Sequence, residues 1–145
     1  MAVEEKIGVV ERDAKERDER RLLNLGHTLA HALETALGYQ NLRHGEAVAY
    51  GMLFAARLAA ARGGDPEVER RLCALLSRLE LPGLPAAEPD RLIALMRRDK
   101  KATEGGLAWV LPMGLGHPRI ERGLSETEVR TELTRFLAAP LRVRG

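Results

Sequence analysis

Three histidines in the first third of the sequence have the residue type and spacing best suited to chemistry. They are His27, His31 and His44, and they fall within 18 consecutive positions of the 145-residue chain. His27 and His31 are four residues apart, so in a helix they share one face, as paired zinc ligands do. Spacing alone is weak support, because such a pair more often packs or lies at the surface. His44 stands at a predicted helix start and could close a site with one open position, which is typical of a catalytic metal.

Polar residues beside these histidines indicate what such a site would bind. Arg20 and Asn24 lie seven and three residues before His27, on roughly the same face of a helix predicted over 18–37. A guanidinium and an amide near a metal favour an anionic, oxygen-rich substrate. A partner chain, water or a carboxylate such as Glu46 could complete the ligand shell. The position of Glu46 favours instead a role at the helix start or in support of a ligand.

The composition indicates one mainly α domain over residues 1–145 and excludes several classes of protein. Hydrophobic residues make up 45% of the chain, charged residues 30% and aromatic residues 3%. The net charge of +2 and the scarcity of aromatic residues argue against binding to nucleic acid. No signal peptide and no apolar run of membrane-spanning length appears, so we expect a cytoplasmic protein without membrane contact. The single cysteine, Cys73, is predicted to be a buried small hydrophobe rather than a reactive thiol.

Hydrophobic periodicity predicts helices over 18–37, 45–62, 66–80, 90–101 and 126–138. Asp65 and Pro66 favour the start of the third helix, and Ser125 with Glu128 forms a capping box for the last. The runs LAWVLP and PRIERG flank the turn-like MGLG and predict a small β-hairpin over 107–123. The third helix is expected to present one apolar stripe, made of Val68, Leu72, Leu75, Leu76 and Leu79.

Several separated motifs resemble the C-terminal domain of the 3-dehydroquinate synthases. They are RRLLNLGHTLAHALE, HGEAVAYGM, MRRDKK and GLAWVLPMGLG. They occur in the family's order from about Lys6 to about Leu137, which is nearly the whole chain. The resemblance implies a lyase of the shikimate pathway, which supplies chorismate and the aromatic amino acids. Its reaction converts 3-deoxy-D-arabino-heptulosonate 7-phosphate to 3-dehydroquinate and phosphate.

The family pattern implies a role for each matching residue. His27 and His44 are expected to bind the metal, zinc or cobalt, whereas His31 becomes the acid/base histidine beside it. The substrate's carboxylate and phosphate are expected to contact Arg20, Asn24, Lys100 and Lys101. Two further catalytic positions fall on Lys6 and Glu16. The residues between Glu16 and Arg20 depart from the family pattern, so solvated surface charges are the alternative reading for Lys6 and Glu16.

The implied chemistry is an elimination followed by a cyclisation. NAD transiently oxidises a ring hydroxyl, phosphate leaves, the hydride returns, and an intramolecular aldol step closes the carbocycle. A metal suits this reaction because it polarises hydroxyl and ketone oxygens. An imidazole suits it because it exchanges protons near neutral pH.

The resemblance covers only the rear domain of the family. The sequence has no glycine-rich loop between a strand and a helix, so NAD is expected to bind an N-terminal half, which in the family also supplies a third metal ligand. We therefore expect a partial chain that is inactive alone, with a sugar phosphate substrate, that N-terminal half and a second copy of itself as partners. The alternatives are the domain of a related sugar-phosphate cyclase or polyol dehydrogenase, and a noncatalytic helical interaction module.

Overall fold

The fold is described from a computed structural model, which covers residues 25–38, 42–84, 87–102 and 109–138; of residues 99–102 only the backbone is described. The helices are α3 (His27–Leu37), α4 (His44–Ala61), α5 (Pro66–Leu76), α6 (Pro89–Ala102) and α7 (Glu126–Ala138). Strands β1 (Trp109–Gly114) and β2 (His117–Glu121) form an antiparallel hairpin. The mainly α fold with one small hairpin is therefore confirmed.

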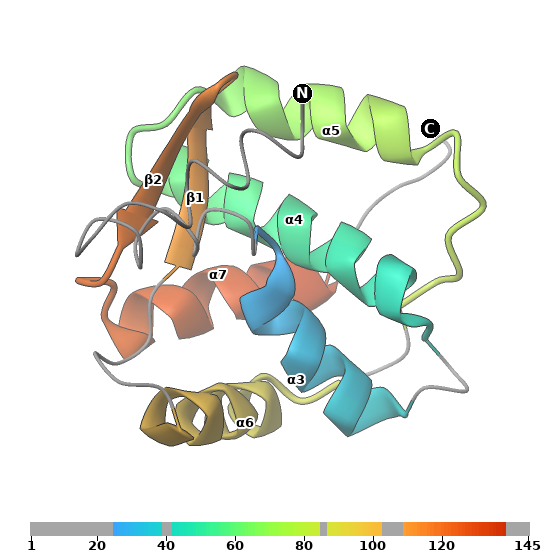
Figure 1. Cartoon of the computed structure of the whole chain (residues 1–145), viewed down its shortest axis with the longest axis vertical. Coiled ribbons are helices and arrows are strands. Elements are labelled where there is room, and N and C mark those ends of the chain that lie inside the picture. Colours follow the sequence, from blue (N-terminus) through green and yellow to red (C-terminus); the bar gives the residue numbers. More distant parts are fainter. Residues whose placement is uncertain (1–24, 39–41, 85–86, 103–108, 139–145) are drawn as a thin grey trace, which may run out of the picture.

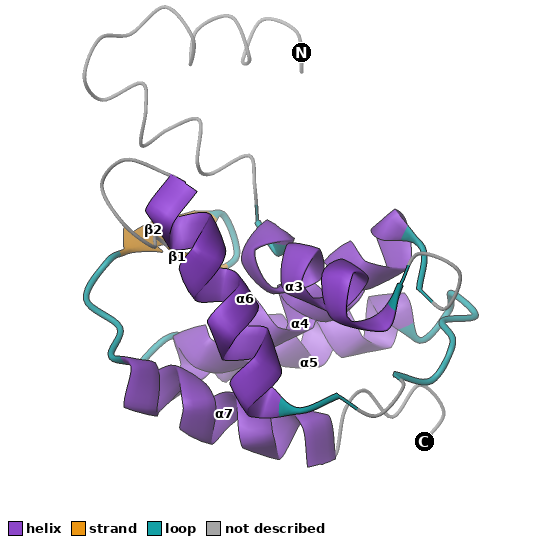
Figure 2. Cartoon of the chain, turned by 90° about the horizontal axis from the view of Figure 1, so that it is seen from below, coloured by secondary structure: helices purple, strands orange, loops and turns teal. Residues whose placement is uncertain are grey.

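Helix α4 lies at the centre of the molecule. It packs against α3, α5, α7 and β1. Helix α6 packs on α3 and α7, on the side of the molecule away from α5 (Figures 1 and 2). Because neighbours surround it, α4 buries residues on every side rather than along one stripe, with Leu53, Phe54 and Leu58 each at most 1% exposed. The Phe54 ring meets Trp109 of β1 and Phe136 of α7, at centroid distances of 5.7 and 5.4 Å. This aromatic cluster joins the hairpin and the last helix to the central one.

Local sequence signals account for the starts of α5 and α7. The Asp65 carboxylate accepts a hydrogen bond from the Glu67 backbone N–H at 2.9 Å, as expected of an N-cap followed by proline. At the start of α7, the Glu128 N–H donates to Ser125 Oγ at 3.1 Å and the Ser125 N–H donates to the Glu128 carboxylate at 3.3 Å. The predicted capping box is therefore confirmed.

Helix α5 is shorter than predicted and buries less. It ends at Leu76 rather than near residue 80. Directly after Leu76, the Ser77 hydroxyl donates a hydrogen bond to the Ala74 carbonyl at 2.7 Å. Leu75 and Leu79, which the sequence assigned to the apolar stripe, are 61% and 52% exposed. The prediction is wrong for these two leucines because α5 contacts the molecule along a narrower face than its pattern of leucines suggested.

Cys73, on the same helix, is half-buried rather than fully buried. Burial raises the pKa of its thiol, and the nearby Glu69 carboxylate adds to this effect. A raised thiol pKa agrees with the predicted unreactive cysteine. Among the described residues, no helix is both long and apolar enough to cross a membrane.

Candidate metal centre

A close crossing of two backbones brings the start of α3, which carries His27, against the middle of α4. Gly26 has φ +85°, and a Cβ added to Gly51 of α4 would lie 1.9 Å from the Gly26 carbonyl oxygen. A Cβ at Gly26 would in turn lie 2.8 Å from the Met52 backbone nitrogen. Only glycine allows this approach and this backbone conformation.

The conformation of Gly26 shows that the predicted helix over 18–37 is wrong at its start. The left-handed Gly26 interrupts the helix, so α3 begins at His27 rather than near Asp18. The inference that Arg20 and Asn24 share a continuous helical face with His27 therefore fails, because that face does not extend past Gly26. Arg20 and Asn24 themselves lie outside the described residues.

The three histidines of the sequence motif come together, with His27 in the middle. Its ring centroid is 5.7 Å from that of His31, one turn further along α3, and 5.6 Å from that of His44, the first residue of α4. Two imidazoles that bind one tetrahedral zinc at about 2.0–2.1 Å have ring centroids roughly 5 Å apart, so both pairs lie near the separation a shared ion requires. Centroid distances therefore do not select one pair over the other.

Hydrogen bonds at Nδ1 distinguish His27 and His44. His27 Nδ1 lies 3.3 Å from the Leu25 carbonyl oxygen, and His44 Nδ1 lies 3.1 Å from Glu34 Oε2. Both oxygens are acceptors, so each Nδ1 is assigned the proton and each Nε2 keeps its lone pair. Metal-binding histidines typically have this arrangement, in which the nitrogen away from the metal donates to a carbonyl or a carboxylate.

Glu34 is a site residue that the sequence did not assign. It lies seven residues, or about two helical turns, after His27 on α3 and is 4% exposed. Glu46, the carboxylate weighed from the sequence, instead accepts a hydrogen bond from the Arg43 backbone N–H at 2.8 Å and so caps the start of α4. The sequence does carry one signal that could have identified Glu34, since it is the single acidic residue in the otherwise mostly apolar run HALETAL.

The remaining predicted residues are placed only in part. Lys6 and Glu16, like Arg20 and Asn24, lie outside the described residues. The backbones of Lys100 and Lys101 belong to the last turn of α6, and α6 packs on the helix that carries His27 and His31. The part of the chain that is described contains no group of three His, Cys, Asp or Glu side chains arranged to hold a metal. Within those residues, the three neighbouring imidazoles therefore do not amount to a complete ligand set.

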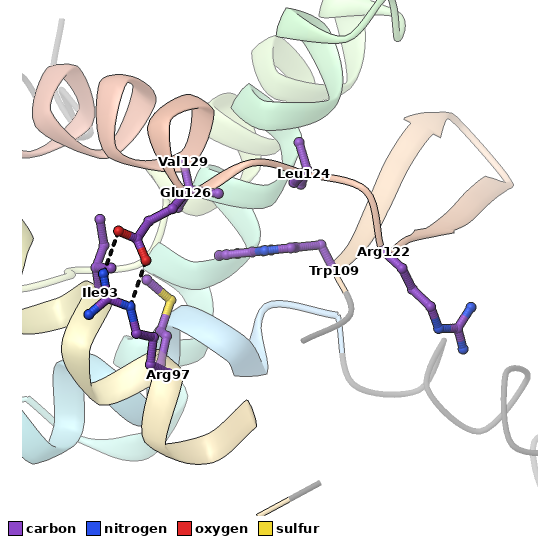
Figure 3. A pocket seen from close by; sticks show the side chains of 8 residues that line it. Ile93, Arg97, Trp109, Arg122, Leu124, Glu126 and Val129 are labelled. Carbon is purple, nitrogen blue, oxygen red and sulfur yellow. Dashed lines mark hydrogen bonds and ion pairs between the residues drawn. The ribbon is translucent and has the colours of Figure 1, made fainter. Parts of the chain in front are cut away.

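A hollow of about 110 Å³ lies away from the histidines, between α6, β1 and the start of α7 (Figure 3). Five of its eight lining residues are apolar, among them Ile93, Trp109 and Val129. Two of the charged residues that line it, Arg97 and Glu126, face each other, and Arg97 Nε donates to Glu126 Oε1 at 2.6 Å, while the side chain of the third, Arg122, points away from them (Figure 3). Because Arg97 and Glu126 are paired with each other and Arg122 points away, the hollow is better explained as packing between elements than as a binding site.

Comparison with known proteins decides which family these features belong to. A family model described as the C-terminal domain of 3-dehydroquinate synthase matches residues 1–102. This chain belongs to the 3-dehydroquinate synthase family. It is 47% identical over 137 residues to the 3-dehydroquinate synthase of Xanthomonas oryzae pv. oryzae (strain PXO99A), covering 87% of this chain and 36% of that protein. It is 42% identical over 147 residues to that of Rhodopseudomonas palustris (strain TIE-1), covering 92% of this chain and 38% of the relative.

Among solved structures, this member of the 3-dehydroquinate synthase family is similar to 2-deoxy-scyllo-inosose synthase in complex with carbaglucose-6-phosphate, NAD⁺ and Co²⁺. The match has a TM-score of 0.63 and 25% identity, and it covers 77% of this chain and 32% of that one. The chain thus spans little more than a third of the length of its relatives, and it corresponds to their C-terminal domain.

Proposed function

We propose that these 145 residues form the metal- and substrate-binding domain of a 3-dehydroquinate synthase. The complete enzyme would convert 3-deoxy-D-arabino-heptulosonate 7-phosphate to 3-dehydroquinate and phosphate. The names of the relatives and their 42–47% identity over most of this chain support the activity. The observation that carries the metal site is the pair His27 and His44, whose Nδ1 atoms both face oxygen acceptors while Nε2 stays available.

The donor set fits zinc or cobalt, because imidazole nitrogen suits both ions. His27 and His44 would hold the metal, with a third ligand from outside the described residues. The chemistry that a bound metal supplies is polarisation of substrate oxygens, and that of NAD is reversible acceptance of a hydride. His31 is exposed and lies edge-on to His27, so its ring is available to take a proton from a substrate oxygen near the metal and to return it.

The substrate and its partners follow from the same proposal. Arg20, Asn24, Lys100 and Lys101 would bind the carboxylate and phosphate of the substrate, with Lys6 and Glu16 as further catalytic groups. NAD would bind an N-terminal region outside these 145 residues, because the chain spans about 36% of the Xanthomonas relative. We further propose a cytoplasmic homodimer.

The test combines binding with activity. Calorimetric titration of the 145-residue chain should detect Zn²⁺ or Co²⁺ and no NAD, and phosphate release from the heptulosonate phosphate should require added N-terminal region from a relative. Turnover by the chain alone above a His27→Ala control, or micromolar binding of NAD, would contradict the proposed division of roles. Failure of wild-type chain to bind either metal would contradict the metal centre.

A second candidate is a related sugar-phosphate cyclase. It is favoured by the likeness to 2-deoxy-scyllo-inosose synthase, whose solved complex contains a sugar phosphate analogue. The reconstituted enzyme should be assayed with glucose 6-phosphate beside the heptulosonate phosphate. A higher kcat/KM for glucose 6-phosphate would favour this second candidate over the dehydroquinate synthase.

A further inference from the structure

The Glu34 carboxylate lies in an environment that is costly for a charge. It is 4% exposed, and within the described part of the chain it is the one charged residue that is buried. Its neighbours along α3, Ala30, Ala32 and Leu33, are buried apolar residues. An ionised carboxylate loses its hydration in such surroundings, so it needs a hydrogen-bonding partner there.

The partner that the structure gives Glu34 is the ring of His44. The contact joins two helices, since Glu34 lies on α3 and His44 begins α4, and Nδ1 is 3.1 Å from Oε2. The His44 side chain is 58% exposed, so packing restrains its ring little. Apart from the tilted contact with His27, this hydrogen bond is what fixes how the described His44 ring is turned.

We infer that Glu34 is a positioning residue for the metal site: by accepting the Nδ1 proton of His44, it holds the ring in the tautomer that leaves Nε2 free. The inference rests on the proposed function for the identity of the bound ion. His27 obtains the same arrangement from the backbone carbonyl of Leu25, which no side-chain substitution removes. His44 depends instead on a side chain, so its orientation is open to mutational test.

A carboxylate does more here than a neutral acceptor would. Its negative charge polarises the Nδ1–H bond of the ring that donates to it, which makes Nε2 a stronger donor to a metal. An amide oxygen in the same place would still accept the proton but would add no charge. Glu34→Gln and Glu34→Met therefore separate the two effects, since glutamine keeps an acceptor and methionine keeps only the approximate length of the side chain.

The first measurement needs no metal. Nitrogen-15 NMR of the histidine rings, at mildly alkaline pH where imidazole is neutral, reports which ring nitrogen of His44 carries the proton. We expect the Nδ1-protonated form in the wild type and in Glu34→Gln, and a mixture of tautomers in Glu34→Met. A His44 signal that is unchanged in a folded Glu34→Met protein would overturn the inference.

The second measurement is affinity for Co²⁺, followed by visible absorption and by competition with a chelator. We expect Glu34→Met to weaken binding by about 10- to 100-fold, the usual effect of losing the acceptor behind a histidine ligand, and Glu34→Gln to lie between it and the wild type. The matched control is Glu46→Gln, which removes a carboxylate two residues from His44 that bonds the Arg43 backbone rather than a ring. Its affinity should stay close to that of the wild type.

The outcomes separate this inference from the proposed function. An equal loss of affinity in Glu46→Gln and Glu34→Gln would show a general effect of charge and would overturn the role of Glu34. If the wild type binds neither Co²⁺ nor Zn²⁺, the proposed metal centre fails, and the NMR measurement still decides whether Glu34 sets the tautomer. Thermal melts identify any variant that is merely unfolded. If Glu34→Met is unfolded, the comparison between Glu34→Gln and the wild type decides the inference.

Discussion

The substitution Gly51→Ala probes the contact on which the histidine pair depends. A Cβ at this position would lie 1.9 Å from the Gly26 carbonyl oxygen, whereas ordinary van der Waals contact begins at 3.4 Å. The start of α3 would have to retreat from α4 by about 1.5 Å, because the Cβ is attached rigidly to the α4 backbone and the oxygen it meets belongs to the backbone before α3. No rotation of a side chain can relieve it.

The cost follows from this displacement. Overpacking a core usually costs about 1–3 kcal/mol, and a clash between a rigidly attached Cβ and a backbone oxygen lies at or above the upper end of that range. Moving α3 about 1.5 Å away from α4 also removes much of the dispersion energy between the facing atoms of the two helices. The better helix propensity of alanine returns about 1 kcal/mol. We expect a net loss of about 3 kcal/mol, enough to lower the melting temperature by roughly 10 °C.

The assay is thermal unfolding beside Gly45→Ala, a matched control on the same helix. Nothing lies within 4 Å of a Cβ added at Gly45, so that alanine should stabilise the protein by about 0.5–1 kcal/mol. Because Gly26 directly precedes His27, Gly51→Ala should also weaken Co²⁺ binding in whatever protein remains folded. A Gly51→Ala protein that melts as high as Gly45→Ala would refute the close approach of the two backbones.

Three further predictions concern single side chains. In the complete enzyme, His27→Ala and His44→Ala should remove the metal, whereas His31→Ala should keep it and slow turnover by about 10²- to 10⁴-fold; metal analysis beside kcat would detect an equal metal loss. Cys73 should react slowly with a disulfide reagent at neutral pH until the protein unfolds, because burial raises its thiol pKa; rapid reaction of the folded protein would contradict this. Paired arginines lower the pKa of Glu67 from 4.5 to about 2, so its contribution to stability is present above pH 4.5 and is lost as pH falls toward 2. The stability of Glu67→Gln, measured by unfolding as a function of pH, should lack the loss between pH 4.5 and 2 that Glu67 contributes. Stability curves of identical shape for the wild type and Glu67→Gln would contradict the lowered pKa of Glu67.

Much of the fold could be predicted because its signals are local. The helices α4, α6 and α7 occupy the expected positions, since periodicity and caps such as Ser125 with Glu128 act within a few residues. The hairpin was also foreseen from two extended runs around a turn. These features need no knowledge of what lies across the molecule.

The failures arise where distant segments meet. Gly26 reads as an ordinary residue within a helical pattern, and only the approach of Gly51, 25 positions later, explains its left-handed backbone. Leu75 fits the periodic stripe of α5, yet no described neighbour covers it sufficiently to bury it. The role of Glu34 has no local signal for a similar reason, because its partner His44 belongs to another helix. The spacing of the histidines likewise suggested a pair on one helix, whereas the Nδ1 hydrogen bonds favour a pair across two.

The central position of α4 has a consequence for how the protein opens and closes in solution. Amides in the middle of this helix are covered on every side, so their hydrogen exchange should require global unfolding. His44 occupies its first turn, where exposure is high and local fraying costs little. One end of the most protected element is therefore free to fluctuate without loosening the rest. If His44 binds the proposed metal, small changes at this turn would alter how long the ion stays bound while the melting temperature of the domain hardly moves.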